Sequence, residues 1–270
     1  MTYVIDHDYH LHSQLSLCSN DPAQTTERML QYAQQYGLTS LCLTDHFWDE
    51  AIPGALGAFY QKQTVAHIRQ ALPLPQGEGV RFLFGGECDV DRFGHVTITR
   101  ETCDTMDFVV VPTTHMHLGG QAFPHGETRT PAERADLWVQ RFDVLLNSDL
   151  PLYKMGVAHL ACSLMDNTSH ENYLETMKLI PSEEMYRLFK KAAEAGLGIE
   201  INSFDMHYLP EEEDTVLRMF RIAKECGCKF YLGSDAHHPH ELDQAIPFFQ
   251  KAIDALGLEE SDKYHVPNMK

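Results

Sequence analysis

The feature that most constrains the fold of this chain is a repeated alternation between short apolar runs and longer segments with helical spacing. The runs are too short and too continuously apolar for amphipathic helices, and they are typical of strands buried in a parallel sheet. Repeated strand–helix units place the helices outside such a sheet. Seven units in one chain therefore predict a barrel of the TIM type with one unit fewer.

The individual elements follow from apolar spacing and from turn and capping residues. The first strand is predicted to end at His10-Leu11-His12, and the others lie at residues 40–44, 80–84, 107–112, 155–159, 197–202 and 229–233. Helices are predicted at residues 25–36, 58–71, 131–146, 182–195, 212–226 and 241–256. Residues 96–99 are expected to form half of a hairpin. Residues 113–130 and 160–181 are expected to be long loops that overhang the strand ends.

Length and charge limit the classes of protein. A chain of 270 residues fits one large α/β barrel, so residues 1–270 are expected to form a single domain. The chain has 21 Lys and Arg against 39 Asp and Glu, a formal net charge of −18. This charge repels nucleic acid and anionic membranes. We therefore expect no extended nucleic-acid groove and no membrane association.

Cysteine usage and the N-terminal segment predict the compartment. The seven cysteines are odd in number and scattered, which favours a reducing environment over a disulfide framework. The first residues lack the cationic and long apolar regions of a signal peptide, and no run approaches 18 apolar residues. The protein is therefore expected to be cytoplasmic.

Potential metal ligands follow almost every predicted strand. Alternate side chains of a strand share a face, so His10 and His12 can bind one ion together. The strand ends of an α/β barrel meet at one rim, which is where the active site is built. Imidazole and carboxylate groups suit zinc, iron or manganese. The candidate ligands at this rim are His10, His12, His46, Glu87, His115, His159, Asp235 and His237.

Taken together, these segments resemble the polymerase and histidinol phosphatase (PHP) domain superfamily over nearly the whole chain. The resemblance is carried by residues 8–13 (DYHLHS), 43–46 (LTDH), 86–87 (GE), the segment around His115, 157–159 (VAH) and 233–237 (GSDAH). It implies a distorted (β/α)7 barrel with two or three divalent metal ions, zinc, iron or manganese, at the C-terminal ends of the strands. By position, His10, His12, Glu87 and Asp235 match the first site.

The resemblance also implies the remaining ligands. Glu87 matches the bridge to a second ion, which His115 and His159 would hold. His46 and His237 match ligands of a third ion. The third site of the family commonly takes a His or Asp six residues after His12, where this chain has Cys18. Three possibilities stay open there: a Cys18 thiolate ligand, a replacement by Asp21, or a third site that is weakly occupied.

Two further assignments are open at the same rim. His115 and His117 both follow the fourth strand and would share a face. His115 fits the family spacing better, whereas His117 would contact substrate or lie in a solvated loop. Asp45 is expected to be a structural carboxylate behind the ligands, with orienting a ligand or accepting a proton as the alternatives. Arg129 is expected to be a surface residue, with a phosphate clamp as the alternative.

The ligand set and the resemblance predict a metal-dependent phosphatase acting on a small phosphorylated substrate, with histidinol phosphate, and thus histidine biosynthesis, most suggested. Two divalent cations roughly 3.5–4 Å apart can activate a water and stabilise the attacked and leaving oxygens. One alternative is a phosphodiesterase or nuclease acting on nucleotides or nucleic-acid ends. Another alternative, from a different class, is a non-catalytic metal-binding scaffold. No oligomeric state is predicted.

Overall fold

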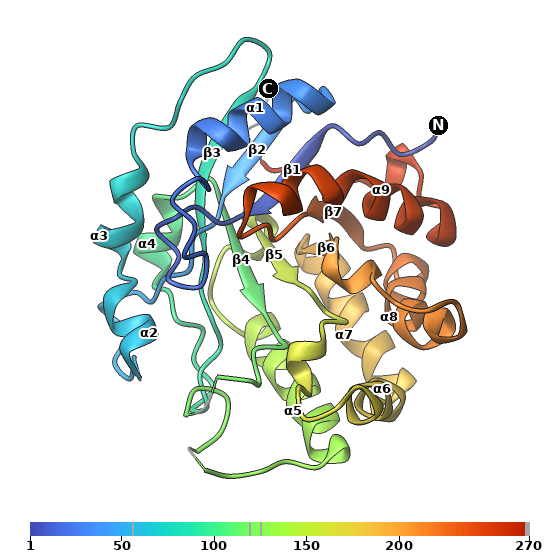
Figure 1. The fold of residues 1–270 in the computed structure, drawn as a ribbon. Coiled ribbons are helices and arrows are strands. Elements are labelled where there is room, and N and C mark those ends of the chain that lie inside the picture. The colour runs from blue at the N-terminus through green and yellow to red at the C-terminus, as the bar shows by residue number, and fades with distance from the viewer. Residues whose placement is uncertain (56, 119, 125, 268–270) are drawn as a thin grey trace.

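The computed structural model describes residues 1–55, 57–118, 120–124 and 126–267, and its centre is a seven-stranded parallel sheet (Figure 1). Each strand pairs with the next one along the chain. The strands are β1 (His7–Leu11), β2 (Ser40–Leu43), β3 (Arg81–Glu87), β4 (Phe108–Pro112), β5 (Met155–Ala158), β6 (Gly198–Asn202) and β7 (Lys229–Gly233). Six of the strands are buried along their whole length or all but their first residue, as the continuous apolar runs predict.

The sheet curls into a nearly closed barrel because β1 and β7 meet at its seam. The Asp235 amide donates to the His10 carbonyl at 2.8 Å, and the His12 amide donates to the Ala236 carbonyl at 3.2 Å. Buried Asp8 accepts a hydrogen bond from the Ser234 amide at 3.0 Å. The seam therefore brings the first and the last of the predicted ligand motifs, around His12 and Asp235, next to each other.

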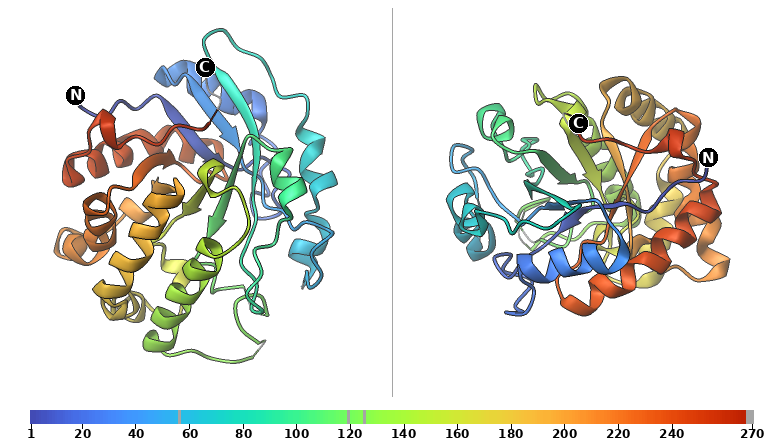
Figure 2. Two further views of the ribbon diagram at one scale, coloured as in Figure 1. Left: turned by 180° about the vertical axis from the view of Figure 1, so that it is seen from behind. Right: turned by 90° about the horizontal axis from the view of Figure 1, so that it is seen from above.

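Helices surround the strands, which Figure 2 shows from behind and from above. The α-helices are α1 (Thr26–Tyr36), α2 (Gly57–Lys62), α3 (Val65–Ile68), α4 (Arg100–Asp104), α5 (Pro131–Leu146), α6 (His170–Leu179), α7 (Ser182–Ala195), α8 (Glu213–Glu225) and α9 (Pro239–Leu256). Short 3-10 turns are η1 (Arg69–Ala71), η2 (Leu152–Lys154), η3 (Ser163–Met165), η4 (Phe204–Met206), η5 (Pro210–Glu212) and η6 (Glu260–Asp262). The predicted (β/α)7 barrel is confirmed.

Helix ends follow their capping residues closely. Thr25 caps α1, which ends before Gly37 in the left-handed conformation. A reciprocal capping box between Thr130 and Glu133 begins α5. Gly196 ends α7 in the left-handed conformation. The bounds predicted for α5 and α7 are therefore confirmed to the residue.

Two predicted segments differ from the structure. Residues 58–71 are not one helix, because the chain breaks at Gln63, whose carbonyl accepts from the Trp48 amide, and Thr64 then caps α3. Residues 160–181 are not a continuous loop, because Ser169 caps α6 within them. The short hairpin near residues 96–99 is present as a bridge between Val90 and Val96.

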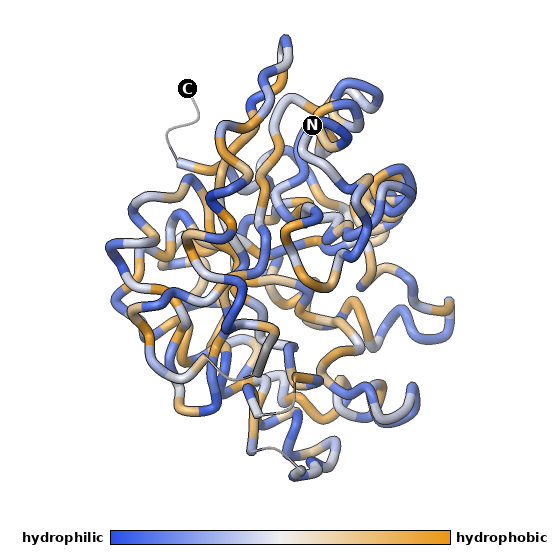
Figure 3. The backbone as a smooth tube through the Cα atoms, turned by 60° about the vertical axis from the view of Figure 1, so that its left-hand side comes forward, coloured by the Kyte–Doolittle hydropathy of each residue, from blue (hydrophilic) through white to orange (hydrophobic). Residues whose placement is uncertain are grey.

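Aromatic side chains fill the barrel interior at the end opposite the predicted ligands. Tyr9, Phe108 and Tyr231 belong to one buried cluster inside the strands. The Tyr231 ring is accommodated by Gly156, where a Cβ atom would lie 2.4 Å from the ring. Along the backbone, hydrophobic and hydrophilic stretches alternate, and hydrophilic ones lie along many of the outer turns (Figure 3). Among the described helices, none is long and apolar enough to cross a membrane.

Candidate metal centre

The buried Glu87 carboxylate, at the last residue of β3, lies at the middle of the cluster of predicted ligands. Its Oε2 atom is 3.4 Å from His10 Nε2 and 3.3 Å from His12 Nε2. Asp235 Oδ1 faces the same two nitrogens, at 3.4 Å from His10 and 3.1 Å from His12. These four residues, predicted as a first site, are therefore brought together.

The other oxygen of Glu87 faces a second pair of histidines. Glu87 Oε1 is 3.1 Å from His159 Nε2 and 3.7 Å from His115 Nε2. All three side chains are buried, and their ligand atoms lie close enough to hold one ion. His117 is not in this group; its ring packs edge-on against His115, with the centroids 5.4 Å apart. Of the two alternatives, the geometry thus selects His115.

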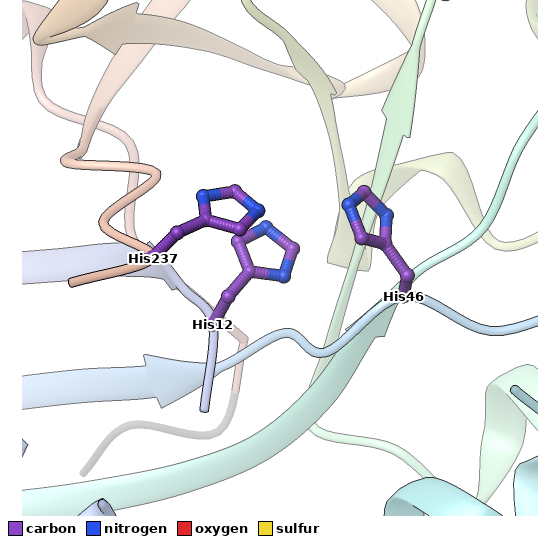
Figure 4. A group of neighbouring side chains, drawn as sticks. All are labelled: His12, His46 and His237. Atoms are coloured by element: carbon purple, nitrogen blue, oxygen red, sulfur yellow. The ribbon is translucent and has the colours of Figure 1, made fainter. Parts of the chain in front are cut away.

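A third group lies on the open side of the cluster, where the ligand atoms of His12, His46 and His237 converge (Figure 4). The three rings come from the segments that follow β1, β2 and β7, and the rings of His12 and His237 stack with centroids 4.2 Å apart. Cys18 lines the same pocket as His46 and His237, and these two imidazoles lower the pKa of its thiol. Asp21 instead pairs with His238 at 3.3 Å. The structure therefore places Cys18, and not Asp21, beside this group.

Hydrogen bonds on the outer ring nitrogens fix the orientation of His10 and His12. His10 Nδ1 donates to Glu200 Oε1 at 2.6 Å, deep in the barrel. His12 Nδ1 donates to the Ser16 hydroxyl at 3.0 Å, and that hydroxyl donates to Asp45 at 2.7 Å. Such contacts set the tautomer of a ligating histidine. Asp45 thus holds the hydroxyl that contacts His12, as a structural carboxylate behind the ligands would.

His115 and His159 are held in the same way. His115 Nδ1 donates to Asp89 Oδ2 at 3.2 Å, and the other Asp89 oxygen accepts from buried Arg141 at 2.6 Å. His159 Nδ1 donates to the Thr114 hydroxyl at 2.6 Å. These four histidines therefore direct Nε2 toward Glu87, whereas a fifth, His46, faces it through Nδ1.

The charges of the cluster favour a cation. Burial alone would lower the pKa of His10, but Glu200, Asp235 and Glu87 raise it well above its usual value. Burial alone would raise the pKa of Glu87, but His46 and His10 hold it well below its usual range. Each shift has the same cause, because buried carboxylates are stabilised by positive charge on the imidazoles. A bound metal ion would supply that charge.

The donor set passes a direct test of its fit to metal ions. His10 Nε2 and His12 Nε2 are 3.0 Å apart, and both carry lone pairs when their Nδ1 atoms are the donors. His46 Nδ1 and Glu87 Oε2 are 2.8 Å apart, yet neither has a hydrogen-bond partner among the described residues. Buried ligand atoms packed this closely are unfavourable unless a proton or a metal ion joins them, and the raised pKa of His10 shows that protons take this place in the metal-free cluster. The residues therefore fit divalent metal ions.

Two ligand candidates have unusual backbone conformations. His159 has φ +30° and Asp235 has φ +55°. Non-glycine residues in the left-handed region cost about 1–3 kcal/mol each and persist where surrounding structure holds them. The His159 amide donates to Glu200 Oε2 at 2.6 Å, and the Asp235 amide bonds to β1 across the seam. These contacts offset the cost of turning both side chains into the cluster.

A small pocket of about 160 Å³ opens onto the cluster. Its polar wall is formed by Cys18, His46, His115, His117, Asp235 and His237. Its apolar wall is formed by Phe59, Leu118 and Leu164. Burial lowers the pKa of His117 to about 3, helped by neighbouring His115, so the ring is neutral in this pocket. The space suits a small molecule bound against the ligand atoms.

Arg129, the predicted surface residue, does not line this pocket. It pairs with Glu127 at 2.6 Å and lies over the Phe123 ring, 5.7 Å from its centroid. Arg129 thus has the surface role expected of it. Gly119 and His125, which belong to the same predicted loop, lie outside the described residues.

Strand alternation and spacing did not single out the residues that orient the ligands: Glu200, Asp89, Thr114, Ser16 and Arg141. One signal was present, because Glu200 is a lone carboxylate inside the apolar strand β6. A charge there is buried and needs a partner. The identity of that partner, His10, depends on the closed barrel.

Three comparisons place the chain among known proteins. The model of the PHP domain family matches residues 8–204. A probable phosphatase from Caldicellulosiruptor bescii is 23% identical over 228 residues, which cover 84% of this chain and 79% of that protein.

One similar crystal structure is that of histidinol phosphate phosphatase from Lactococcus lactis subsp. lactis, complexed with Zn, L-histidinol and phosphate. It matches this chain with a TM-score of 0.61 at 20% identity, and the match covers 92% of this chain and 93% of that one. A probable 2-pyrone-4,6-dicarboxylic acid hydrolase from Acinetobacter baumannii has a TM-score of 0.45 at 14% identity, with coverage of 96% and 97%. The Lactococcus lactis structure shares the fold.

Proposed function

The chain belongs to the PHP domain family, and on this basis we propose that it is a metal-dependent phosphatase acting on a small phosphorylated substrate. One observation carries the proposal. Four buried histidines, each oriented by a hydrogen bond on Nδ1, present Nε2 to the two oxygens of Glu87. A scaffold without catalysis would have little need for so many oriented ligands beside an open pocket.

The ligand groups would divide among two or three ions. His10, His12, Glu87 and Asp235 would hold the first ion, and Glu87, His115 and His159 the second. His46, His237 and Cys18 would hold a third. When bound, divalent ions of this kind lower the pKa of a water toward neutrality and offset charge on phosphoryl oxygens.

The protein's own residues would position the substrate and limit its size. Phe59, Leu118 and Leu164 would contact the organic part of the ester and exclude water from the reacting side. The neutral His117 ring has a buried Nδ1 without a hydrogen-bond partner among the described residues, and it would bind a polar group of the substrate. A pocket of about 160 Å³ favours a small monoester over a polymer.

Histidinol phosphate is the first substrate to test. The probable phosphatase of Caldicellulosiruptor bescii and the histidinol phosphate phosphatase of Lactococcus lactis support the choice of a phosphate monoester. Zinc is the first metal to test, because it is bound in the Lactococcus lactis structure, and iron and manganese suit the same ligands. We place the enzyme in the cytoplasm and, through this substrate, in histidine biosynthesis.

The test combines metal analysis with assays of phosphate release. Purified protein loaded with Zn, Mn or Fe is assayed on p-nitrophenyl phosphate, histidinol phosphate and bis-p-nitrophenyl phosphate. We expect turnover of the monoesters, and loss of both metal and activity in Glu87→Gln. The matched control is Glu78→Gln at an exposed position, which should behave as wild type. Preferred cleavage of the diester would indicate a phosphodiesterase instead. Metal binding without turnover of any of these substrates would indicate a scaffold.

A further inference from the structure

A second cavity lies on the other side of the segment that follows β5. It has a volume of about 250 Å³, and its walls include Cys162, Ser163, Tyr173 and Asp205. Leu164, the next residue after Ser163, lines the metal pocket instead. The turn η3 therefore forms a wall between two different cavities, of which the proposed phosphatase reaction uses only one.

Two buried polar atoms in the walls of this cavity, Asp205 Oδ1 and the Tyr208 hydroxyl, have no hydrogen-bond partner among the described residues. The Asp205 side chain is buried, with the residue only 4% exposed. Its Oδ2 accepts a hydrogen bond from the Ala161 amide at 3.1 Å. Because buried acceptors are nearly always paired with protein, water or a ligand, Asp205 Oδ1 is available to a ligand that carries a donor group.

The other walls indicate what kind of donor fits. Tyr173, Phe204 and Tyr208 place aromatic side chains around the same space, and aromatic faces attract cations. Lys251 Nζ already lies 3.5 Å from the centroid of the Tyr208 ring, so one of these rings accepts an ammonium group. Glu212 adds a second carboxylate, hydrogen-bonded to His170 at the rim. The described lining residues include neither lysine nor arginine.

We propose that this cavity is a binding site for a small organic ammonium ion, which donates to Asp205 Oδ1 and packs its apolar part against Tyr173 and Phe204. The combination of a buried carboxylate and aromatic walls selects a cation over a neutral alcohol or an anion. The bound cation also stabilises the shared wall, because Asp205 holds the Ala161 amide two residues after His159. The site is independent of the phosphatase reaction, and its test needs no substrate.

The test uses benzylammonium chloride as the probe and benzyl alcohol as its uncharged isostere. Burial raises the pKa of Asp205 to about 7, so calorimetric titrations at about pH 8 keep the carboxylate mostly ionised. We expect saturable binding of benzylammonium by wild type and binding at least about tenfold weaker for benzyl alcohol. Asp205→Asn, which can still accept from the Ala161 amide, should weaken benzylammonium at least about tenfold. The control Asp104→Asn, at an exposed position, should bind benzylammonium as tightly as wild type.

Hydrogen–deuterium exchange locates the probe, and we expect slower exchange in residues 159–165 and 204–212. The proposal would be overturned if wild type does not bind benzylammonium, or if wild type and folded Asp205→Asn bind it with equal affinity. It would also be overturned if wild type binds benzyl alcohol as tightly as benzylammonium, or if protection is confined to residues around His12. Circular dichroism reports whether Asp205→Asn folds. If it does not, Phe204→Ala at the partly exposed wall decides, because it should weaken benzylammonium severalfold and an unchanged affinity would contradict the site.

Discussion

The inner and outer parts of the ligand cluster are held in different ways. The inner group, His10, His12, His115 and His159 around Glu87, is buried, and each histidine has a hydrogen bond on its second ring nitrogen. Within the described residues, the outer group, Cys18, His46 and His237, has such a bond at His237, whose Nδ1 lies 2.7 Å from the Asp235 carbonyl oxygen, but His46 Nδ1 has none and the cysteine is exposed. The inner group is therefore organised before a metal binds, whereas the outer group would be completed by the metal.

The largest effect is expected for His12→Ala, because the His12 ring faces both groups. Loss of this side chain should reduce the bound metal and lower kcat/KM by about three orders of magnitude or more. Elemental analysis and phosphatase assays measure the two quantities. His95→Ala, whose ring is largely exposed at the surface, is the control. Full activity of His12→Ala would contradict the proposed cluster.

Glu200→Gln probes the organisation of the inner group. The amide oxygen can still accept from His10 Nδ1 but lacks the charge that makes this imidazole a stronger ligand. We expect metal affinity to fall about 10–100-fold, measured by competition with a chelator. Glu194→Gln, at an exposed position on α7, should leave affinity unchanged. If both variants bind metal with equal affinity, the Glu200 charge does not strengthen His10 as a ligand and Glu200 has only a packing role.

Cys18→Ala tests the outer group by itself. Because Cys18 lies beside His46 and His237 at the pocket and belongs to neither group around Glu87, its loss should lower the metal content per chain while the inner ions remain. Activity should fall by no more than about tenfold, a smaller effect than for His12. Metal stoichiometry by elemental analysis gives the answer. An unchanged stoichiometry would remove Cys18 from the ligands.

The pH dependence of Cys18 alkylation gives the smallest effect. Although Cys18 is exposed as a residue, partial desolvation of its thiol would by itself raise the pKa, but His46 and His237 lower it to about 6. The thiolate is the reactive form, so in metal-free protein the rate with iodoacetamide should rise through about pH 6 and level off above it. Cys226, whose pKa burial raises, should react only at higher pH in the same peptide map. A Cys18 midpoint near the ordinary value of about 8.5 would rule out the pairing.

Strand ends and the resemblance to the PHP family together predicted the ligand candidates that the structure brings together. His10 and His12 lie two residues apart at the end of β1, and the structure brings their Nε2 atoms to 3.0 Å. Glu87 ends β3 and lies between two groups of histidines, at the position of the bridge that the resemblance implied. Their roles as ligands stay a prediction until metal is measured, as does the single domain over residues 1–270.

The two misplaced elements have different physical causes. The break at Gln63 comes from a hydrogen bond to Trp48, which is 15 positions away along the chain, so a tertiary contact overrode the local preference there. The helix α6 begins at a Ser169 cap within a polar stretch that has no strong apolar period, so its local signal was present but weak.

The sequence by itself determined the barrel and the residues at its rim, because buried strands and helical spacing are local patterns and strand ends must meet at one edge. Only the tertiary structure decided which nitrogen of each histidine points inward. That choice depends on Glu200, Ser16, Asp89 and Thr114, which lie close to their histidines in space. A hydrogen bond between distant segments leaves no period in the sequence, so His115 was separated from His117, and Cys18 from Asp21, only by the closed barrel.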